Sequence, residues 1–116
     1  MKALFLGSWD KSDPYWVIKI YFNIMYADGD FIEALTLLTS RNGLSTDGAY
    51  CHFLCHEHPN SREVEFAFGY PPTEEDEIIV DEAICFKYAR EACELYLREH
   101  PDKAAIIERL VASIPA

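Results

Sequence analysis

The sequence predicts an α+β fold, in which a three-stranded antiparallel meander carries N-terminal helices and two C-terminal helices packed on one face. Two observations lead to this prediction. The middle of the chain alternates apolar and polar residues in short segments separated by turn residues, which is the pattern of half-buried strands. Both ends of the chain instead place apolar residues at helical spacing. We expect a single domain over residues 1–116, because a chain of this length can bury a sizeable core without disulfides or a metal ion.

Composition narrows the class of protein. Half of the residues are hydrophobic and 14% are aromatic, which excludes a disordered acidic tail. A formal net charge of −10 and an isoelectric point of about 4.7 argue against direct binding to nucleic acid or to an anionic membrane. No secretory segment is recognisable, and the apolar run 15–27 is too short to span a membrane. The four cysteines lack the spacing of a disulfide framework, so we expect reduced thiols in a cytoplasmic protein.

The N-terminal part is expected to hold one short strand and two helices. Residues 2–6 are an apolar run that suits a strand. Asp13-Pro14 predicts a helix start, since the carboxylate can accept from free amides and proline fits the first turn. An apolar stripe at 16–24 favours that helix, although its β-branched and aromatic residues leave a strand open. Asp28-Gly29-Asp30 ends the element and resembles the capping box of a second helix at 31–39.

Three strands follow. After an Asp47-Gly48 turn, residues 50–57 alternate, and 63–70 alternate again until two prolines stop the ladder. A third strand is expected at 77–80. If residues 58–61 form the hairpin loop, the apolar residues fall on one face and the His and Glu residues on the other. The expected pairs are Cys55 with Val64, Phe53 with Phe66, Cys51 with Phe68, His56 with Glu63, and Leu54 with Glu65.

Two helices close the chain. Asp81 is positioned to cap a long helix over residues 82–99, and Pro101 ends it. A last helix is expected at about 102–111. Both show one apolar stripe, and the long helix has an outer face of evenly mixed charge.

Most of the excess charge is confined to one segment. Residues 63–82 contain eight acids and no base, for a formal charge of −8. Residues 1–62 carry −2 and residues 83–116 carry 0, which completes the −10 of the chain. Localised like charge weakens folding but steers association, so we interpret the segment as a surface for a basic protein. A merely solvated acidic edge is the alternative. The residues expected to bind the partner are Glu63, Glu65, Tyr70, Glu74, Glu75, Asp76 and Glu77.

Metal binding by the Cys and His residues between positions 51 and 58 is the less favoured alternative. Zinc needs four ligands that converge on one point. On a strand, the thiols of Cys51 and Cys55 point away from the imidazoles of His52 and His56, and no second Cys-x-x-Cys pair completes a site. We therefore expect no metal and no cofactor.

Acid–base catalysis by His52 and His56, with Glu63 or Glu65, is the main enzymatic alternative. It would give a small ribonuclease-like hydrolase. Cleavage of a polyanion, however, needs Lys or Arg to stabilise the transition state, and the neighbours here are carboxylates. A Cys–His nucleophile can also be drawn, but the thiols are expected to face the core. We assign no catalytic residue.

A family resemblance is clearest over residues 63–104. It is carried by Phe68-Gly69-Tyr70-x-Pro72-x-Glu74-Glu75-Asp76, Ile79-x-Asp81-Glu82, Tyr88, Ala92-Cys93-x-x-Tyr96-Leu97 and His100-Pro101. With these residues the chain resembles the immunity proteins of bacterial contact-dependent growth inhibition (CDI) systems, the type paired with ribonuclease toxins. The resemblance implies a small cytoplasmic protein without catalysis of its own, which covers the nuclease site of a delivered toxin domain.

The leading hypothesis is therefore a stoichiometric inhibitor that binds a basic nuclease toxin domain in a 1:1 complex, without contacting nucleic acid or membrane itself. The rival from an enzyme class is the His52–His56 hydrolase. A third interpretation is an acidic adaptor or nucleic-acid mimic, which would need carboxylates spaced along two strands, and the compact cluster here does not show that spacing.

Overall fold

The computed structural model describes residues 3–46 and 48–115, and it confirms the α+β class. The sheet is antiparallel with the order β1-β2-β3, so that β2 is central. The helices and strands are α1 (Trp16–Ala27), α2 (Phe31–Leu38), β1 (Ala49–Phe53), β2 (Glu63–Phe68), β3 (Glu77–Asp81), α3 (Glu82–Glu99) and α4 (Ala104–Ser113). Short 3-10 helices are η1 (Leu54–His56), η2 (Glu74–Asp76) and η3 (Pro101–Lys103).

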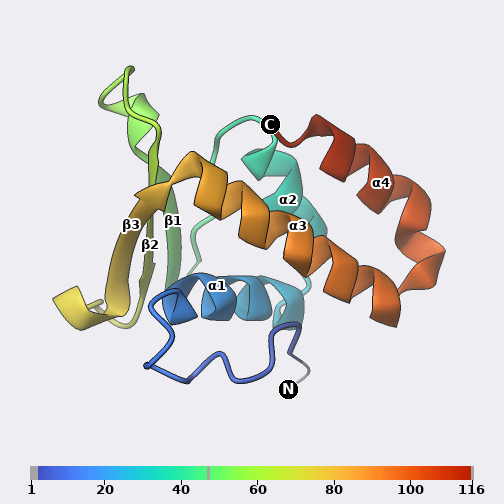
Figure 1. The fold of residues 1–116 in the computed structure, drawn as a ribbon, viewed down its shortest axis with the longest axis horizontal. Helices are drawn as coiled ribbons and strands as arrows, with labels where there is room; N and C mark the ends of the chain where they lie inside the picture. Colours follow the sequence, from blue (N-terminus) through green and yellow to red (C-terminus); the bar gives the residue numbers. More distant parts are fainter. Residues whose placement is uncertain (1–2, 47, 116) are drawn as a thin grey trace.

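The helices lie on one side of the sheet (Figure 1). α1 packs directly on the strands, α3 crosses beside it, and α4 forms an outer layer against α2 and α3. Aromatic rings join the layers: the Phe66 ring of β2 lies 5.3 Å from that of Tyr21 and 6.5 Å from that of Phe22, centroid to centroid. Phe53 of β1 meets Phe86 of α3 at 6.1 Å. All five are almost fully buried, so the core is centred between α1 and the sheet.

The predicted hairpin register is wrong by two residues. Cys51 pairs with Phe66 and Phe53 with Val64, and His52 takes the position opposite Glu65. The cause is the connection: the expected strand 50–57 stops at Phe53, and the next three residues coil into η1, which lengthens the loop. Because the shift is an even number of residues, the side chains within β1 and β2 keep their predicted faces.

The expected N-terminal strand is absent from the described residues 3–6, which form a bend and a turn. Their backbone is instead satisfied by one buried side chain. The N–H groups of Leu4 and Phe5 both donate to Asn23 Oδ1 of α1, at 2.9 and 2.8 Å. Asn23 Nδ2 in turn donates to the Phe5 carbonyl and to Ser8 Oγ, both at 3.0 Å. With these groups paired, no ladder partner is needed.

The helix bounds agree closely with the prediction, whereas the predicted N-terminal capping bonds of α2 and α3 are not formed. α3 spans the predicted residues, and α2 ends one residue early. Neither Asp30 nor Asp81 makes a side-chain capping bond. Asp30 lacks the extended backbone of an N-cap, and Asp81 is itself the last residue of β3. Gly29 takes the expected positive φ of 80°, and of the Asp47-Gly48 turn only Gly48, at 86°, lies within the described residues. The last helix is divided into η3 and α4.

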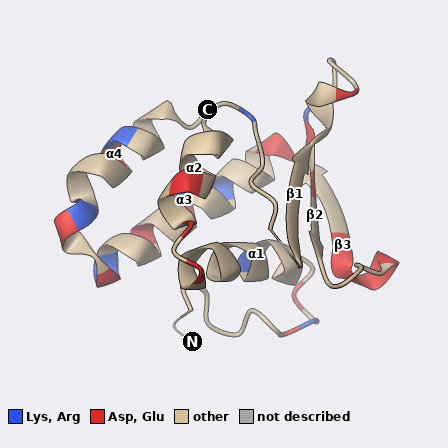
Figure 2. Cartoon of the chain, turned by 180° about the vertical axis from the view of Figure 1, so that it is seen from behind, with Lys and Arg blue, Asp and Glu red and all other residues tan. Residues whose placement is uncertain are grey.

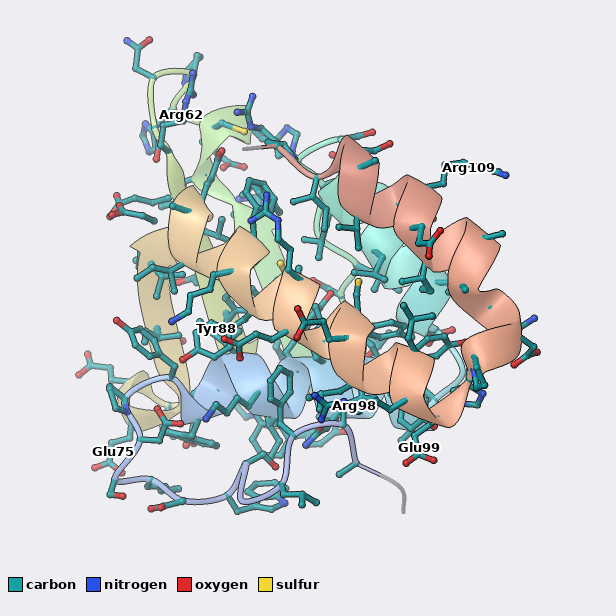
Figure 3. The ribbon with its side chains drawn as sticks, turned by 45° about the vertical axis from the view of Figure 1, so that its right-hand side comes forward. Arg62, Glu75, Tyr88, Arg98, Glu99 and Arg109 are labelled. Atoms are coloured by element: carbon teal, nitrogen blue, oxygen red, sulfur yellow. The ribbon has the colours of Figure 1, made fainter. Side chains whose placement is uncertain are left out.

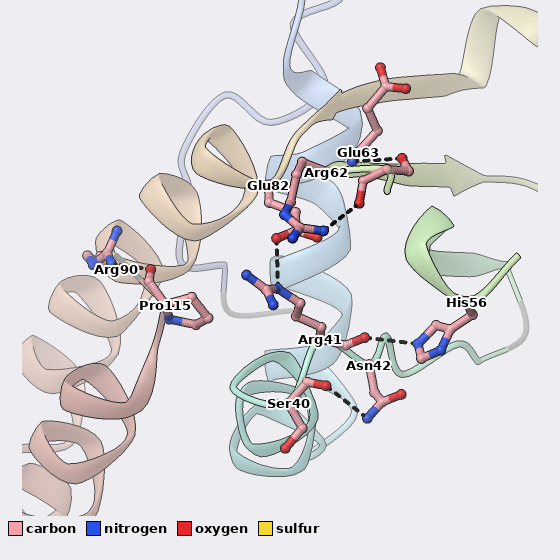
Figure 4. A network of polar contacts seen from close by, with 10 residues as sticks. Ser40, Arg41, Asn42, His56, Arg62, Glu63, Glu82, Arg90 and Pro115 are labelled. Atoms are coloured by element: carbon pink, nitrogen blue, oxygen red, sulfur yellow. Dashed lines mark hydrogen bonds and ion pairs between the residues drawn. The ribbon is translucent and has the colours of Figure 1, made fainter. Parts of the chain in front are cut away.

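An ion pair between the partly exposed Arg41 and the buried Glu82 ties the start of α3 to the segment after α2 (Figure 4). The Glu82 side chain is 6% exposed, and its Oε1 accepts from Arg41 Nε at 2.9 Å. Its backbone N–H donates to the Arg62 carbonyl at 2.7 Å. Glu82 Oε2 is buried without a hydrogen-bond partner. Arg41 thus supplies a countercharge to a carboxylate that would be costly to bury alone.

Candidate functional site

The two faces of the sheet differ in what covers them. One face is buried under the helices, and it carries Cys51, Phe53, Val64, Phe66 and Val80. The opposite face points away from α1 to α4 (Figure 1). Its side chains follow from the register, in rows across the three strands: His52, Glu65 and Ile79; Tyr50, Ala67 and Glu77; and Glu63 with Asp81. Within the described residues, no helix lies on this face.

The uncovered face is acidic. Glu63, Glu65, Glu77 and Asp81 are its carboxylates, and we call them the acidic face. The three strands contain no Lys or Arg. Figure 2 shows the acidic colour along β3 and the turn before it. Glu63 and Asp81 occupy directly paired positions on neighbouring strands. Like charges in that relation destabilise a sheet, so this placement is not explained by folding.

The η2 turn continues the acidic face beyond the start of β3. Glu74 and Glu75 are exposed there. Asp76 is different: it accepts from Thr73 Oγ1 at 3.0 Å and lies 3.7 Å from Lys11 Nζ. Its carboxylate is only 24% exposed, and it is already engaged by Lys11 of the segment 3–15, which we call the N-terminal loop.

Tyr70 lies at the same end of the sheet, just beyond β2. Its side chain is 75% exposed. The ring also covers Gly48, where an added Cβ would come within 2.5 Å of the ring atoms. The backbone strengthens this contact, because Gly69 N–H donates to the Gly48 carbonyl at 3.0 Å. Tyr70 is thus an exposed aromatic whose one side is fixed against the protein.

The two candidate catalytic histidines are near one another but engaged elsewhere. Their ring centroids are 6.3 Å apart. His52 Nε2 lies 2.7 Å from Glu57 Oε2, and this hydrogen bond lowers the pKa of Glu57. His56 Nε2 lies 3.0 Å from the Arg41 carbonyl. The predicted pair of His56 with Glu63 is wrong, because His56 belongs to η1 and not to a strand.

Three of the four thiols, those of Cys51, Cys85 and Cys93, lie in the core, and Cys55 is partly buried against it. Burial raises the pKa of Cys51 well above its ordinary value, and it raises the pKa of Cys85 and of Cys93 to about 12. Cys51 also lies on the opposite side of the sheet from His52, so these two residues do not form a nucleophile–base pair. Among the described residues, no three His, Cys, Asp or Glu side chains are grouped so that they could hold a metal ion.

The structure adds three residues that the sequence interpretation left out of the site. Asp81 was assigned to a cap, yet it lies on the acidic face. Ile79 is 52% exposed in the row of Glu65. Glu57 reaches His52 from the hairpin loop. For the first two the signal was present, because the alternation that points Ile78 and Val80 inward points Ile79 and Asp81 outward. Glu57 could not be placed without the true hairpin geometry.

Fold and surface together describe a small α+β protein with an uncovered acidic sheet face, of the kind suited to binding another protein. A family model described as "CDI immunity protein" matches residues 14–111. The chain therefore belongs to the CDI immunity protein family.

One solved structure shares the fold over nearly its whole length. It is the crystal structure of the immunity protein NMB0503 from Neisseria meningitidis MC58, with a TM-score of 0.75 and 18% identity, covering 97% of this chain and 98% of that one. No curated protein matches the sequence. In the part of the chain that the structure describes, no helix is long and apolar enough to cross a membrane.

Proposed function

We propose that this protein is the cytoplasmic inhibitor of the nuclease toxin domain, a ribonuclease, of its own CDI system. It binds the toxin domain 1:1 through the acidic face and the η2 turn and has no catalytic activity of its own. Family membership supports the immunity role, and the paired carboxylates Glu63 and Asp81 support the choice of surface. They are the observation that carries the proposal, since a cationic side chain bound between or beside them would relieve their repulsion.

The chemistry fits a nuclease partner. A ribonuclease holds RNA phosphates with Lys and Arg, and the same groups form charge-assisted hydrogen bonds with carboxylates. Glu63, Glu65 and Glu77 present such carboxylates from rigid strands, and Glu74 and Glu75 extend them at one end. The inhibitor must also reach the toxin before RNA does. Electrostatic steering raises association rates to the order of 10⁸ M⁻¹ s⁻¹ at low salt.

The test uses the purified C-terminal domain of the large secreted protein that we expect the neighbouring upstream gene to encode. Wild-type protein is expected to abolish its RNA cleavage at a 1:1 ratio. The double variant Glu63→Lys, Glu77→Lys is expected to slow association about tenfold or more at low salt, and less at high salt.

The matched control is Glu94→Lys, Glu108→Lys, which makes the same charge change at exposed positions of α3 and α4. Its association rate should stay within about threefold of wild type, because those residues lie away from the proposed surface. Equal slowing by both variants would show that only net charge matters, and the assigned surface would then be wrong.

A further inference from the structure

The N-terminal loop is held rigidly although part of it faces solvent. Asn23 of α1 makes four buried hydrogen bonds to it, as described above. Further along, Asp10 Oδ1 accepts from the backbone N–H and the hydroxyl of Ser12, at 3.0 and 2.6 Å. Lys11 Nζ lies 5.0 Å from the Trp16 ring centroid and 3.7 Å from Asp76. The loop is thus fixed at both ends and is joined to the η2 turn.

This fixed loop exposes large apolar side chains. Leu6 is 88% exposed and Trp9 is 57% exposed. The inner side of Trp9 packs edge-on against Phe68, with ring centroids 5.2 Å apart, so its orientation is set by the core. Surface hydrophobics are common singly, but here two of them flank one hollow.

The hollow is an apolar pocket of about 270 Å³ between the loop and α1. Leu6 and Trp9 line it together with Ile20 and Ile24. An apolar cavity of about 150 Å³ is enough to hold benzene. The pocket is therefore large enough for one leucine, methionine or phenylalanine side chain.

The pocket adjoins the proposed toxin-binding surface. Figure 3 shows the N-terminal loop running beneath α1 from the side of Glu99 to the side of Glu75. The contact of Lys11 with Asp76 and that of Trp9 with Phe68 join the loop to η2 and to the end of β2. A partner seated on the η2 turn would therefore lie next to the part of the loop that holds Trp9 and Lys11.

We propose that this pocket is the apolar anchor site of the toxin interface, and that it receives an apolar side chain flanking a Lys or Arg of the toxin domain. The inference rests on the proposed function and adds a second, non-ionic contact to it. Charge complementarity favours this occupant, because Asp10 lines the pocket and Lys11 joins the loop to the acidic η2 turn, whose carboxylates would repel an anionic membrane. Preorganisation favours it too, since a fixed aromatic loses little entropy on binding.

The decisive variant is Leu6→Ser, because Leu6 is almost fully exposed and its loss should leave the fold unchanged. Trp9→Ser is the stronger variant, although it also removes a contact with Phe68. Ile106→Ser, an exposed aliphatic on α4, is the matched control. The probe is the same purified toxin domain, and its dissociation rate is measured at low and at high salt.

We expect dissociation about threefold faster or more for Leu6→Ser, about tenfold or more for Trp9→Ser, and within twofold of wild type for Ile106→Ser. The increase in dissociation rate of Leu6→Ser and Trp9→Ser should be the same at high salt, where the effect of the charge variants becomes smaller. If wild type binds, the charge variants weaken binding, and Leu6→Ser does not, the anchor is overturned while the proposed function stands. The anchor is also overturned if Leu6→Ser dissolves a homodimer of this protein but leaves toxin binding unchanged. If wild type does not bind the toxin domain, the proposed function itself fails.

Discussion

The two faces of the same three strands are built by opposite rules. On the buried face, Phe53, Val64 and Phe66 have no exposed surface. On the uncovered face, Glu63 lies opposite Asp81 in a relation that destabilises the sheet. Because successive residues of a strand alternate between faces, one segment can satisfy both rules. Inward residues of a strand therefore determine stability, and the outward residues next to them are available for partner binding. A substitution on one face should change one property without changing the other.

The largest effect should come from the buried face. We expect Phe66→Ala to lower the free energy of unfolding by about 3–5 kcal/mol, because it removes the ring that Tyr21 and Phe22 pack against. Urea unfolding followed by tryptophan fluorescence measures this. A loss below about 1 kcal/mol would mean that the sheet is not the centre of the core.

The second largest effect should be a fall in the free energy of unfolding at alkaline pH, caused by the buried thiols. Cys85 and Cys93 have folded-state pKa values raised to about 12 by burial, so in the unfolded chain these thiols lose their protons at lower pH than in the folded one. The unfolded state therefore binds fewer protons above the ordinary thiol pKa, and stability falls from about pH 9 towards pH 12. The slope is at most about 1.4 kcal/mol per pH unit for each thiol.

The control for this pH dependence is the double variant Cys85→Ala, Cys93→Ala. Its free energy of unfolding, followed from pH 8 to pH 11, should fall less steeply than that of wild type. Equal slopes would show that other groups, such as the buried Tyr21, dominate the alkaline loss.

The smallest effect on stability should come from the uncovered face. Glu63→Gln removes the repulsion with Asp81, so the free energy of unfolding should stay unchanged or rise by about 0.2–1 kcal/mol. Toxin association at low salt should nevertheless slow. Destabilisation by more than about 1 kcal/mol would place Glu63 in a structural role and erase the contrast between the faces.

The sequence was sufficient to predict the elements that are determined by a local pattern of apolar and polar residues. The alternation in residues 63–68 and the apolar stripe of residues 82–99 predicted β2 and α3. An element that buries one face repeats its apolar residues at the spacing of a strand or of a helix. The register failed because η1 forms where the alternation still continues, and only tertiary packing distinguishes a strand from a coil there. Residues 3–6 read as a strand because the partner of their backbone, Asn23, is distant in sequence.

The candidate surface shows the same division. Counting charge along the chain was enough to predict where the carboxylates gather. It could not show that Asp76 is engaged by Lys11, nor that Trp9 lies beside the end of β2, because both contacts join segments about sixty residues apart in the sequence. The pocket between the N-terminal loop and α1 has no sequence signal at all, since Leu6 and Ile24 are ordinary apolar residues until the loop is folded.

The central claim is that the sheet face without helices is where the toxin binds, and the crystal structure of the complex with the toxin domain tests it most directly. We expect basic side chains of the toxin on Glu63, Glu65 and Glu77, contact with the η2 turn, and burial of Tyr70. A complex in which the toxin sits on α3 and α4, with the acidic face left in solvent, would contradict it.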